Sequence, residues 1–448
     1  MVTSKTDVTQ RLTSLRRWSA KALATQASMP PRRKALIASL ILLTAFAVRS
    51  IHAVDVAPVM YTADQPMLGL TVSYDIRAVS ILSGGGVLVP EIRNPHHTDL
   101  LSYTPGYPIL LAAEYKVLGH NYSNVQFVQS IVNSLTCVLL FFVCGNLLSW
   151  RAGAVAGMLA AIVHAVAYYS VFITPDSLCA LPILLAFYVL ARVRLSTGRS
   201  YGPFVLAGAL LGSAVWLRPN SLLLAVFLWA AILLVRRPLS LAFWRGAVLT
   251  ASCLLVVAPI TVRNYLLYHR FVPVSINLGI VLWEGIGEAP GGRQFGAVKT
   301  DVEVGEQDAE IYNNPGYIYW ASPDGIDRDR DRVRRSLGVI RRHPIWYTGV
   351  ALSRMRSMLN YAGQAPMVLR TPAGGSTQIS TALIPPVALQ AKEAWNSSSK
   401  WALAPGRDIA ILRRPIRLLQ RLAKETLLPV ILIGAAVVFL LSRPRWIL

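Results

Sequence analysis

Residues 74–108 read YDIRAVSILSGGGVLVPEIRNPHHTDLLSYTPGYP, and this polar stretch lies between two apolar runs that are each long enough to cross a bilayer. It combines acids and arginines with tyrosines, a glycine triplet and prolines that fix turns. A helix needs about 20 mostly apolar residues to span the hydrocarbon core. The stretch is therefore predicted to be a loop held against a membrane, where polar chemistry can meet a lipid-borne substrate.

The composition independently indicates an integral membrane protein. Hydrophobic residues make up 54% of the 448 residues and charged residues 15%, whereas soluble globular chains carry about 25% charged residues. The formal net charge is +22, from 44 basic and 22 acidic residues. Many basic residues stand at the ends of apolar runs, which indicates cytoplasmic anchoring and contact with anionic lipid rather than nucleic-acid binding.

Eight apolar runs are predicted to span the membrane, so the expected fold is an all-α polytopic membrane protein. They cover residues 35–55, 124–148, 152–173, 176–195, 203–217, 219–235, 245–262 and 427–442. Basic residues are expected on the cytoplasmic side. The first 34 residues carry eight Lys/Arg against one acid, and a basic residue or cluster follows every second span. This alternation places the N-terminus inside. No small-residue cleavage site follows the first apolar run convincingly, which indicates an uncleaved anchor rather than a signal peptide.

The predicted domains follow from this topology. They are a basic cytoplasmic tail (1–34), a transmembrane core (35–262), an extracytoplasmic or interfacial region (263–426) and a C-terminal transmembrane helix (427–448). The core includes a first extracytoplasmic loop, residues 57–122, which is expected to hold juxtamembrane helices. The clearest is a short apolar helix at 104–118, opened by prolines and closed by Gly119.

Two further helices are expected at the membrane interface. Arginines interrupt the apolar pattern of residues 343–362, and a charge in mid-membrane costs more than neighbouring leucines gain. The segment 408–425 is amphipathic and strongly basic. Its basic density also suits the cytoplasmic face, so the side on which it lies stays open.

Three aspartates are predicted to carry acid–base chemistry. Asp64 begins a helix in the first loop, where a carboxylate near the membrane surface could take a proton from a hydroxyl or amine acceptor. Asp75 follows in the same helix, and Asp176 opens the fourth span on the outer side. Other roles stay open: Asp64 as a helix cap, Asp75 as a surface salt-bridge partner, and Asp176 as a complement to the helix dipole.

Arginines and tyrosines on the same side are predicted to bind the substrate. Arg218 and Arg263 end outward-going spans, where the planar guanidinium suits a phosphate. Snorkelling towards the interface is the alternative for both. The predicted set for a carrier phosphate or sugar is Tyr74, Arg77, Arg93, Tyr103, Tyr107, Arg218 and Arg263.

No motif identifies a cofactor, and a divalent cation is left open. His96, His97 and Asp99 cluster in the first loop and could bind a divalent metal, although short histidine pairs in loops are commonly solvated. Aspartates also alternate with arginines over residues 324–331. The interleaved arginines argue against a cation site there and favour a charged helix start.

In the order and spacing of several motifs, the chain resembles the GT-C class of membrane glycosyltransferases, which includes the protein O-mannosyltransferases (glycosyltransferase family 39) and the lipid A aminoarabinose transferase. The similarity covers about residues 35–360. The motifs are Tyr74 with its spacing to Val89-Pro90, Thr104-Pro105-Gly106-Tyr107-Pro108 with a helix ending in Leu118-Gly119, Asp176, Leu217-Arg218-Pro219, Arg263-Asn264-Tyr265, and His343-Pro344 followed by Trp346.

The resemblance implies an inverting enzyme of a bacterial inner membrane. Such enzymes take a sugar from a polyprenyl-phosphate carrier at the outer face and pass it to a glycan, lipid or protein acceptor. By resemblance Asp64 or Asp75 would be the base, with Asp176 as a second acid near the acceptor. Leu70 stands where relatives often carry an acid, and Thr104 stands near the place of a carrier-binding lysine. Relatives also commonly continue through further spans.

Two other classes stay open. One is a transporter or flippase of lipid-linked glycans, although transporters typically show paired repeats and Gly/Pro-broken midplane helices, which this sequence does not show. The other is a truncated, non-catalytic membrane scaffold, suggested by the missing acid and the early end. The sequence does not determine the sugar, the acceptor, the identity of the base or a metal requirement.

Overall fold

A computed structural model describes residues 29–56, 68–84, 98–193, 200–235 and 238–358. Every regular element in these ranges is helical, which confirms the all-α prediction. The predicted C-terminal span and the basic segment 408–425 lie outside the described residues. So do four predicted site or metal residues, Asp64, Arg93, His96 and His97.

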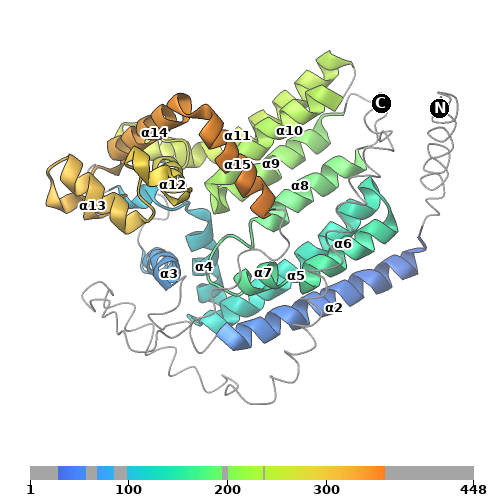
Figure 1. Cartoon of the computed structure of the whole chain (residues 1–448). Coiled ribbons are helices and arrows are strands. Elements are labelled where there is room, and N and C mark those ends of the chain that lie inside the picture. Colours follow the sequence, from blue (N-terminus) through green and yellow to red (C-terminus); the bar gives the residue numbers. More distant parts are fainter. Residues whose placement is uncertain (1–28, 57–67, 85–97, 194–199, 236–237, 359–448) are drawn as a thin grey trace, which may run out of the picture.

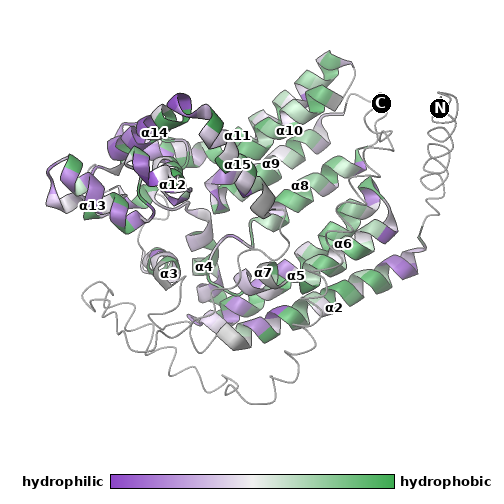
Figure 2. Ribbon diagram, in the orientation of Figure 1, coloured by the Kyte–Doolittle hydropathy of each residue, from purple (hydrophilic) through white to green (hydrophobic). Residues whose placement is uncertain are grey.

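A bundle of roughly parallel, mostly apolar helices forms one part of the molecule (Figures 1 and 2). It contains α2 (Pro31–Val56), α5 (Tyr122–Leu147), α6 (Trp150–Ile162), α8 (Ala180–Arg192), α9 (Gly202–Leu217), α10 (Leu222–Val235) and α11 (Leu239–Tyr268). Three of these, α2, α5 and α11, are long and apolar enough to cross a membrane. The others are shorter apolar helices that pack beside them.

The predicted span at 152–173 is wrong as a continuous helix. Helix α6 ends at Ile162, and the short α7 (His164–Tyr169) begins after a break. Val163 at the break has φ −62° and ψ 121°, an extended conformation. Apolar side chains continue across the break, so hydropathy alone did not reveal it.

Close packing of α9 against α11 depends on two glycines one helical turn apart. A Cβ on Gly208 would lie 2.1 Å from the Leu249 carbonyl oxygen, and one on Gly212 would lie 2.6 Å from the Val256 Cβ. Small residues let helix backbones approach closely in a membrane, where no hydrophobic force drives helices together. These glycines therefore fix the position of α9, which ends beside the candidate site.

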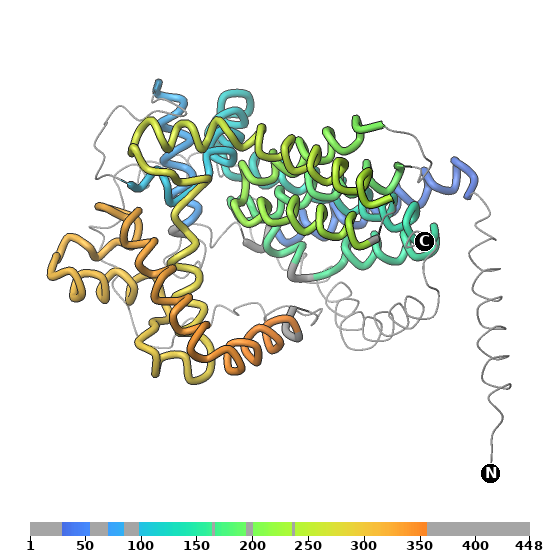
Figure 3. The backbone as a smooth tube through the Cα atoms, turned by 90° about the horizontal axis from the view of Figure 1, so that it is seen from above, coloured from blue at the N-terminus to red at the C-terminus, as the bar shows by residue number. Residues whose placement is uncertain are grey.

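A second, more polar group of helices sits at one end of the bundle (Figures 2 and 3). It comprises α12 (Asn277–Glu288), α13 (Asp301–Ile311), α14 (Gly325–Arg342) and α15 (Pro344–Met358). Nearby lie α3 (Leu68–Leu82) and α4 (Gly106–Leu118) of the first loop (Figure 1). Helix α4 confirms the short helix predicted at 104–118, and Gly119 ends it with φ 82°.

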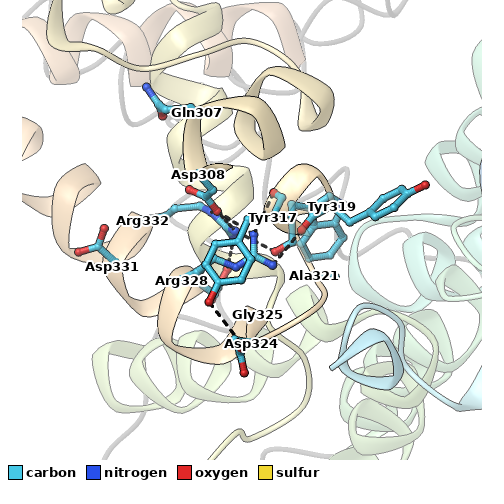
Figure 4. Close-up of polar contacts among 12 residues, drawn as sticks. Gln307, Asp308, Tyr317, Tyr319, Ala321, Asp324, Gly325, Arg328, Asp331 and Arg332 are labelled. Atoms are coloured by element: carbon cyan, nitrogen blue, oxygen red, sulfur yellow. Dashed lines mark hydrogen bonds and ion pairs between the residues drawn. The ribbon is translucent and has the colours of Figure 1, made fainter. Parts of the chain in front are cut away.

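A buried ion cluster holds the polar group together (Figure 4). Asp308 of α13 is fully buried and pairs with Arg328 at 3.1 Å and Arg332 at 2.5 Å. Arg328 also donates to the Tyr319 carbonyl at 2.8 Å, and Arg332 to the Trp320 carbonyl at 2.8 Å. The cluster therefore fixes the loop before α14. Helix α14 begins at Gly325, which confirms that residues 324–331 form a charged helix start.

Candidate functional site

Two cavities of different character meet at Arg218. One, the polar cavity, has a volume of about 410 Å³ and walls in which polar and apolar side chains are mixed, contributed by α3, the Ser102–Thr104 segment, the end of α9, α12 and the start of α13. The other, of about 690 Å³, is lined mostly by apolar side chains of the bundle. Both cavities touch Leu70 and Arg218. A ligand with a polar and an apolar part could therefore bind with its polar part in the first cavity and its apolar part in the second.

Arg218 forms an ion pair with Asp176 at this junction. Its Nη2 donates to the Asp176 Oδ2, and the two side chains are 31% and 51% exposed. Arg218 follows the last residue of α9, and Asp176 lies in the turn before α8. Because both side chains remain partly exposed, the guanidinium is oriented by its partner and still accessible to a ligand.

The three predicted tyrosines form a cluster beside the polar cavity. The Tyr74 ring lies 5.0 Å from both the Tyr103 and the Tyr107 ring centroids, edge to face. Burial raises the pKa of Tyr74, so its hydroxyl stays protonated. Tyr74 and Tyr103 line the polar cavity. Tyr107 packs against Tyr74 and lines neither cavity.

Two predicted arginines lie behind the cavity walls. Arg77 stacks on the Tyr103 ring at 4.4 Å and donates to the Ser73 carbonyl at 2.7 Å. Arg263 is buried and donates through Nε and Nη2 to the Asn264 side-chain oxygen, at 2.9 and 2.7 Å. Neither side chain lines either cavity. The structure thus brings Tyr74, Tyr103, Asp176 and Arg218 together and places these two outside the walls.

Asp75 is buried and engaged by two donors. Its side chain is 3% exposed, and its Oδ1 accepts from the Tyr115 hydroxyl at 2.6 Å and lies 2.8 Å from His120 Nε2. It is therefore not the surface residue that the salt-bridge alternative required. Asp75 links α3 to α4 and to the loop after α4, and it lines neither cavity.

The polar cavity also contains residues that the sequence patterns did not single out. Glu284 of α12 lies on its wall, together with Lys299, Asp301 and Trp320. Burial raises the pKa of Glu284 to about 7, with repulsion from Asp301 and Glu288 adding to the shift. The available signal was Glu284, an acid between the apolar residues 278–283 and 285–287 of α12.

The described ranges contain no group of three or more His, Cys, Asp or Glu residues that could hold a metal ion. The predicted histidines of the metal cluster are outside those ranges. The Asp99 carbonyl accepts from Arg77 Nη2 at 3.3 Å. The structure therefore leaves a divalent cation in the first loop as a prediction.

Residues 102–262 match the family model of the dolichyl-phosphate-mannose-protein mannosyltransferases. The match is to a GT-C family domain and covers less than half of the chain. The matched segment includes Tyr103, Tyr107, Asp176 and Arg218, which are four of the predicted site residues. No curated protein and no solved structure matches the chain. The GT-C domain and its apolar helices support a membrane glycosyltransferase, as the resemblance implied.

Proposed function

We propose that the protein is an inverting glycosyltransferase that moves a sugar from a polyprenyl-phosphate carrier to an acceptor at the extracytoplasmic face of an inner membrane. The observation that carries this proposal is the meeting of a polar and an apolar cavity at Arg218. A lipid-linked sugar has the same division, with an apolar chain, a charged phosphate and a polar sugar in that order.

The proposed donor lies across the junction. Its prenyl chain occupies the apolar cavity, its phosphate contacts Arg218, and its sugar enters the polar cavity beside Tyr74 and Tyr103. A guanidinium binds phosphate through paired N–H donors. Arg77 and Arg263 are proposed to add positive potential from behind the cavity walls, and Arg93 stays a sequence-based candidate for the same role.

The proposed reaction is a single displacement at the anomeric carbon, which inverts its configuration. The acceptor oxygen bonds to that carbon as the bond to the phosphate oxygen breaks. Negative charge then develops on the leaving phosphate, where a preorganised cation stabilises the transition state. Asp176 holds Arg218 in place for this task. Asp64, Asp75 and Asp176 remain the sequence-based candidates for taking the acceptor proton.

The membrane placement is part of the proposal. We assign the polar group of helices to the extracytoplasmic side, because basic residues mark the opposite ends of the predicted spans. A multi-pass topology would combine the long helices with the shorter apolar helices packed beside them. Accepted substrates could be glycans, lipids or proteins that present a hydroxyl or amine at that face.

The test is turnover by the purified full-length protein in proteoliposomes. Polyprenyl-phosphate sugars labelled in the sugar would be supplied with and without candidate acceptors, and release of free polyprenyl phosphate would be measured. We expect release that depends on the protein, with a parallel arm containing a chelator to decide on a cation requirement. No release from any donor tested, by protein shown to be folded, would contradict the proposal.

A further inference from the structure

Glu284 is the one acid that α12 contributes to the wall of the polar cavity. It lies there with Tyr74, Tyr103 and Arg218, which come from other elements. The side chain is partly exposed, so a ligand in the cavity can reach it. Among the described residues, no hydrogen bond or ion pair occupies its carboxylate. The group is thus available to a substrate.

Helix α12 is held rigidly enough to present this carboxylate. The Gly279 amide in its first turn donates to Asp329 Oδ1 of α14 at 2.9 Å. Trp283, next to Glu284, donates to Gln307 of α13 at 2.7 Å, and Arg335 stacks on its ring at 4.9 Å. A catalytic group fixed on an anchored helix needs little reorganisation at the moment of reaction.

The other carboxylates near the site are less suited to accept a proton. Asp75 is buried behind the wall and already accepts from Tyr115. Asp176 is paired with Arg218, so taking up a proton would weaken the ion pair that orients the guanidinium. Asp301 lies on the same cavity as Glu284 but is exposed at the start of α13.

We propose that the α12 wall of the polar cavity is the acceptor subsite and that Glu284 is the general base that receives the acceptor proton. This rests on the proposed function. The acceptor is a hydroxyl-bearing molecule, and its proton passes to a Glu284 carboxylate oxygen as its oxygen bonds to the anomeric carbon. The electron pair of the broken bond stays on the phosphate oxygen, which leaves as the polyprenyl phosphate monoester beside Arg218.

The electrostatic surroundings suit this role. Burial raises the pKa of Glu284 to about 7, and a general base works best with a pKa near the working pH. Asp301 of α13 and Glu288 of α12 repel its ionised form, and Arg332 of α14 favours it. Lys299 and Arg218 line the same cavity, and Arg354 of α15 pairs with Glu288.

The first arm of the test measures turnover against pH. Wild-type protein should become more active as pH rises through about 7, because the base works only when ionised. Glu284→Gln keeps the shape but takes no proton, so turnover should fall about 100-fold or more and lose this rise. Glu284→Asp should restore part of the turnover and part of its rise with pH. Glu306→Gln, an exposed change on α13, is the control and should behave as wild type.

The second arm does not depend on turnover. Infrared titration of the full-length protein should show carboxylic acid absorption that disappears as pH rises through about 7, and the difference between wild type and Glu284→Gln should isolate the part that belongs to Glu284. A folded Glu284→Gln variant with normal turnover and an unchanged pH profile would overturn the proposal. The proposal would also be overturned if Asp64→Asn, and not Glu284→Gln, abolished the rise of turnover with pH. If the Glu284 absorption is present but wild type turns over no donor, the proposed function fails and so does the base role of Glu284.

Discussion

The Arg218 guanidinium is held by the Asp176 carboxylate at the point where a polar cavity and an apolar cavity meet. The two residues come from separate turns, one after α9 and one before α8. Their pairing gives the site a cation whose direction is fixed and whose surface is partly open. The chemistry proposed for the protein depends on this arrangement more than on any other.

Replacing Arg218 should impair catalysis strongly. Arg218→Met removes the cation that faces the leaving phosphate, and loss of one such stabilising group costs about 100-fold to 1,000-fold in turnover. Arg218→Lys should lose less, since it keeps the charge but not the paired donors. The measurement is polyprenyl phosphate release in proteoliposomes. Arg192→Met, at the end of α8, provides a matched arginine control and should retain activity.

Asp176 should act through Arg218. Asp176→Asn keeps the size of the side chain but removes its charge, so the guanidinium loses its fixed direction. We expect turnover to fall by about 10-fold, less than for Arg218→Met. The double variant with Arg218→Met should be no worse than Arg218→Met alone. Additive losses in the double variant would show that Asp176 acts separately, as a second acid would.

Removing the Asp75 side chain should reduce stability more than turnover. Asp75→Ala leaves the buried Tyr115 hydroxyl and His120 without their acceptor, which costs about 1–3 kcal/mol. Asp75→Asn keeps an acceptor and should lose less. Thermal unfolding would be compared with turnover per folded molecule. A stable but inactive Asp75→Asn variant would instead identify Asp75 as the base.

The ion cluster around Asp308 should be needed to keep the polar group of helices folded. Asp308→Asn leaves Arg328 buried without its carboxylate and Arg332 with only Asp329 at 3.8 Å, and breaking a buried pair in this way costs about 3–5 kcal/mol. Proteolysis of α12–α14 at moderate temperature would report the loss. Asp327→Asn changes an exposed aspartate in the first turn of α14 and should leave the cleavage rate unchanged.

Stability should fall as pH rises towards neutrality because of Asp329. Burial raises the pKa of its carboxyl group to about 7, above its value in the unfolded chain, so the folded state favours the protonated form. This contribution is complete below the unfolded pKa and is lost as pH rises through about 7. The unfolding temperature should therefore decline between mildly acidic and neutral pH, and Asp329→Asn should reduce that decline.

The sequence predicted the helices and the Arg218 and Asp176 positions, but it did not predict the α12 wall of the polar cavity. Prolines and Gly119 defined α4, and the ends of apolar runs pointed to Arg218 and Asp176. The break at Val163 was missed because hydropathy does not report backbone angles. Glu284 was missed because only the packing of α12 against α14 brings it beside Tyr74 and Arg218.

Residues that looked equivalent in the sequence differ in the structure in their burial and their side-chain partners. Asp75 and Asp176 were both candidate acids, yet Asp75 is enclosed by Tyr115 and His120 while Asp176 faces a cavity. Arg218 and Arg263 both follow apolar runs in the sequence, yet Arg263 lies within α11 and donates to Asn264, whereas Arg218 reaches the cavities. A linear pattern cannot distinguish such pairs, because side-chain partners come from distant parts of the chain.

The most direct measurement is a structure of the full-length protein in a lipid nanodisc with a non-hydrolysable polyprenyl-phosphate sugar. The account predicts density for the prenyl chain in the apolar cavity, the phosphate against Arg218 and the sugar beside Tyr74 and Glu284. A donor bound elsewhere, with both cavities empty and Arg218 still paired only with Asp176, would contradict it.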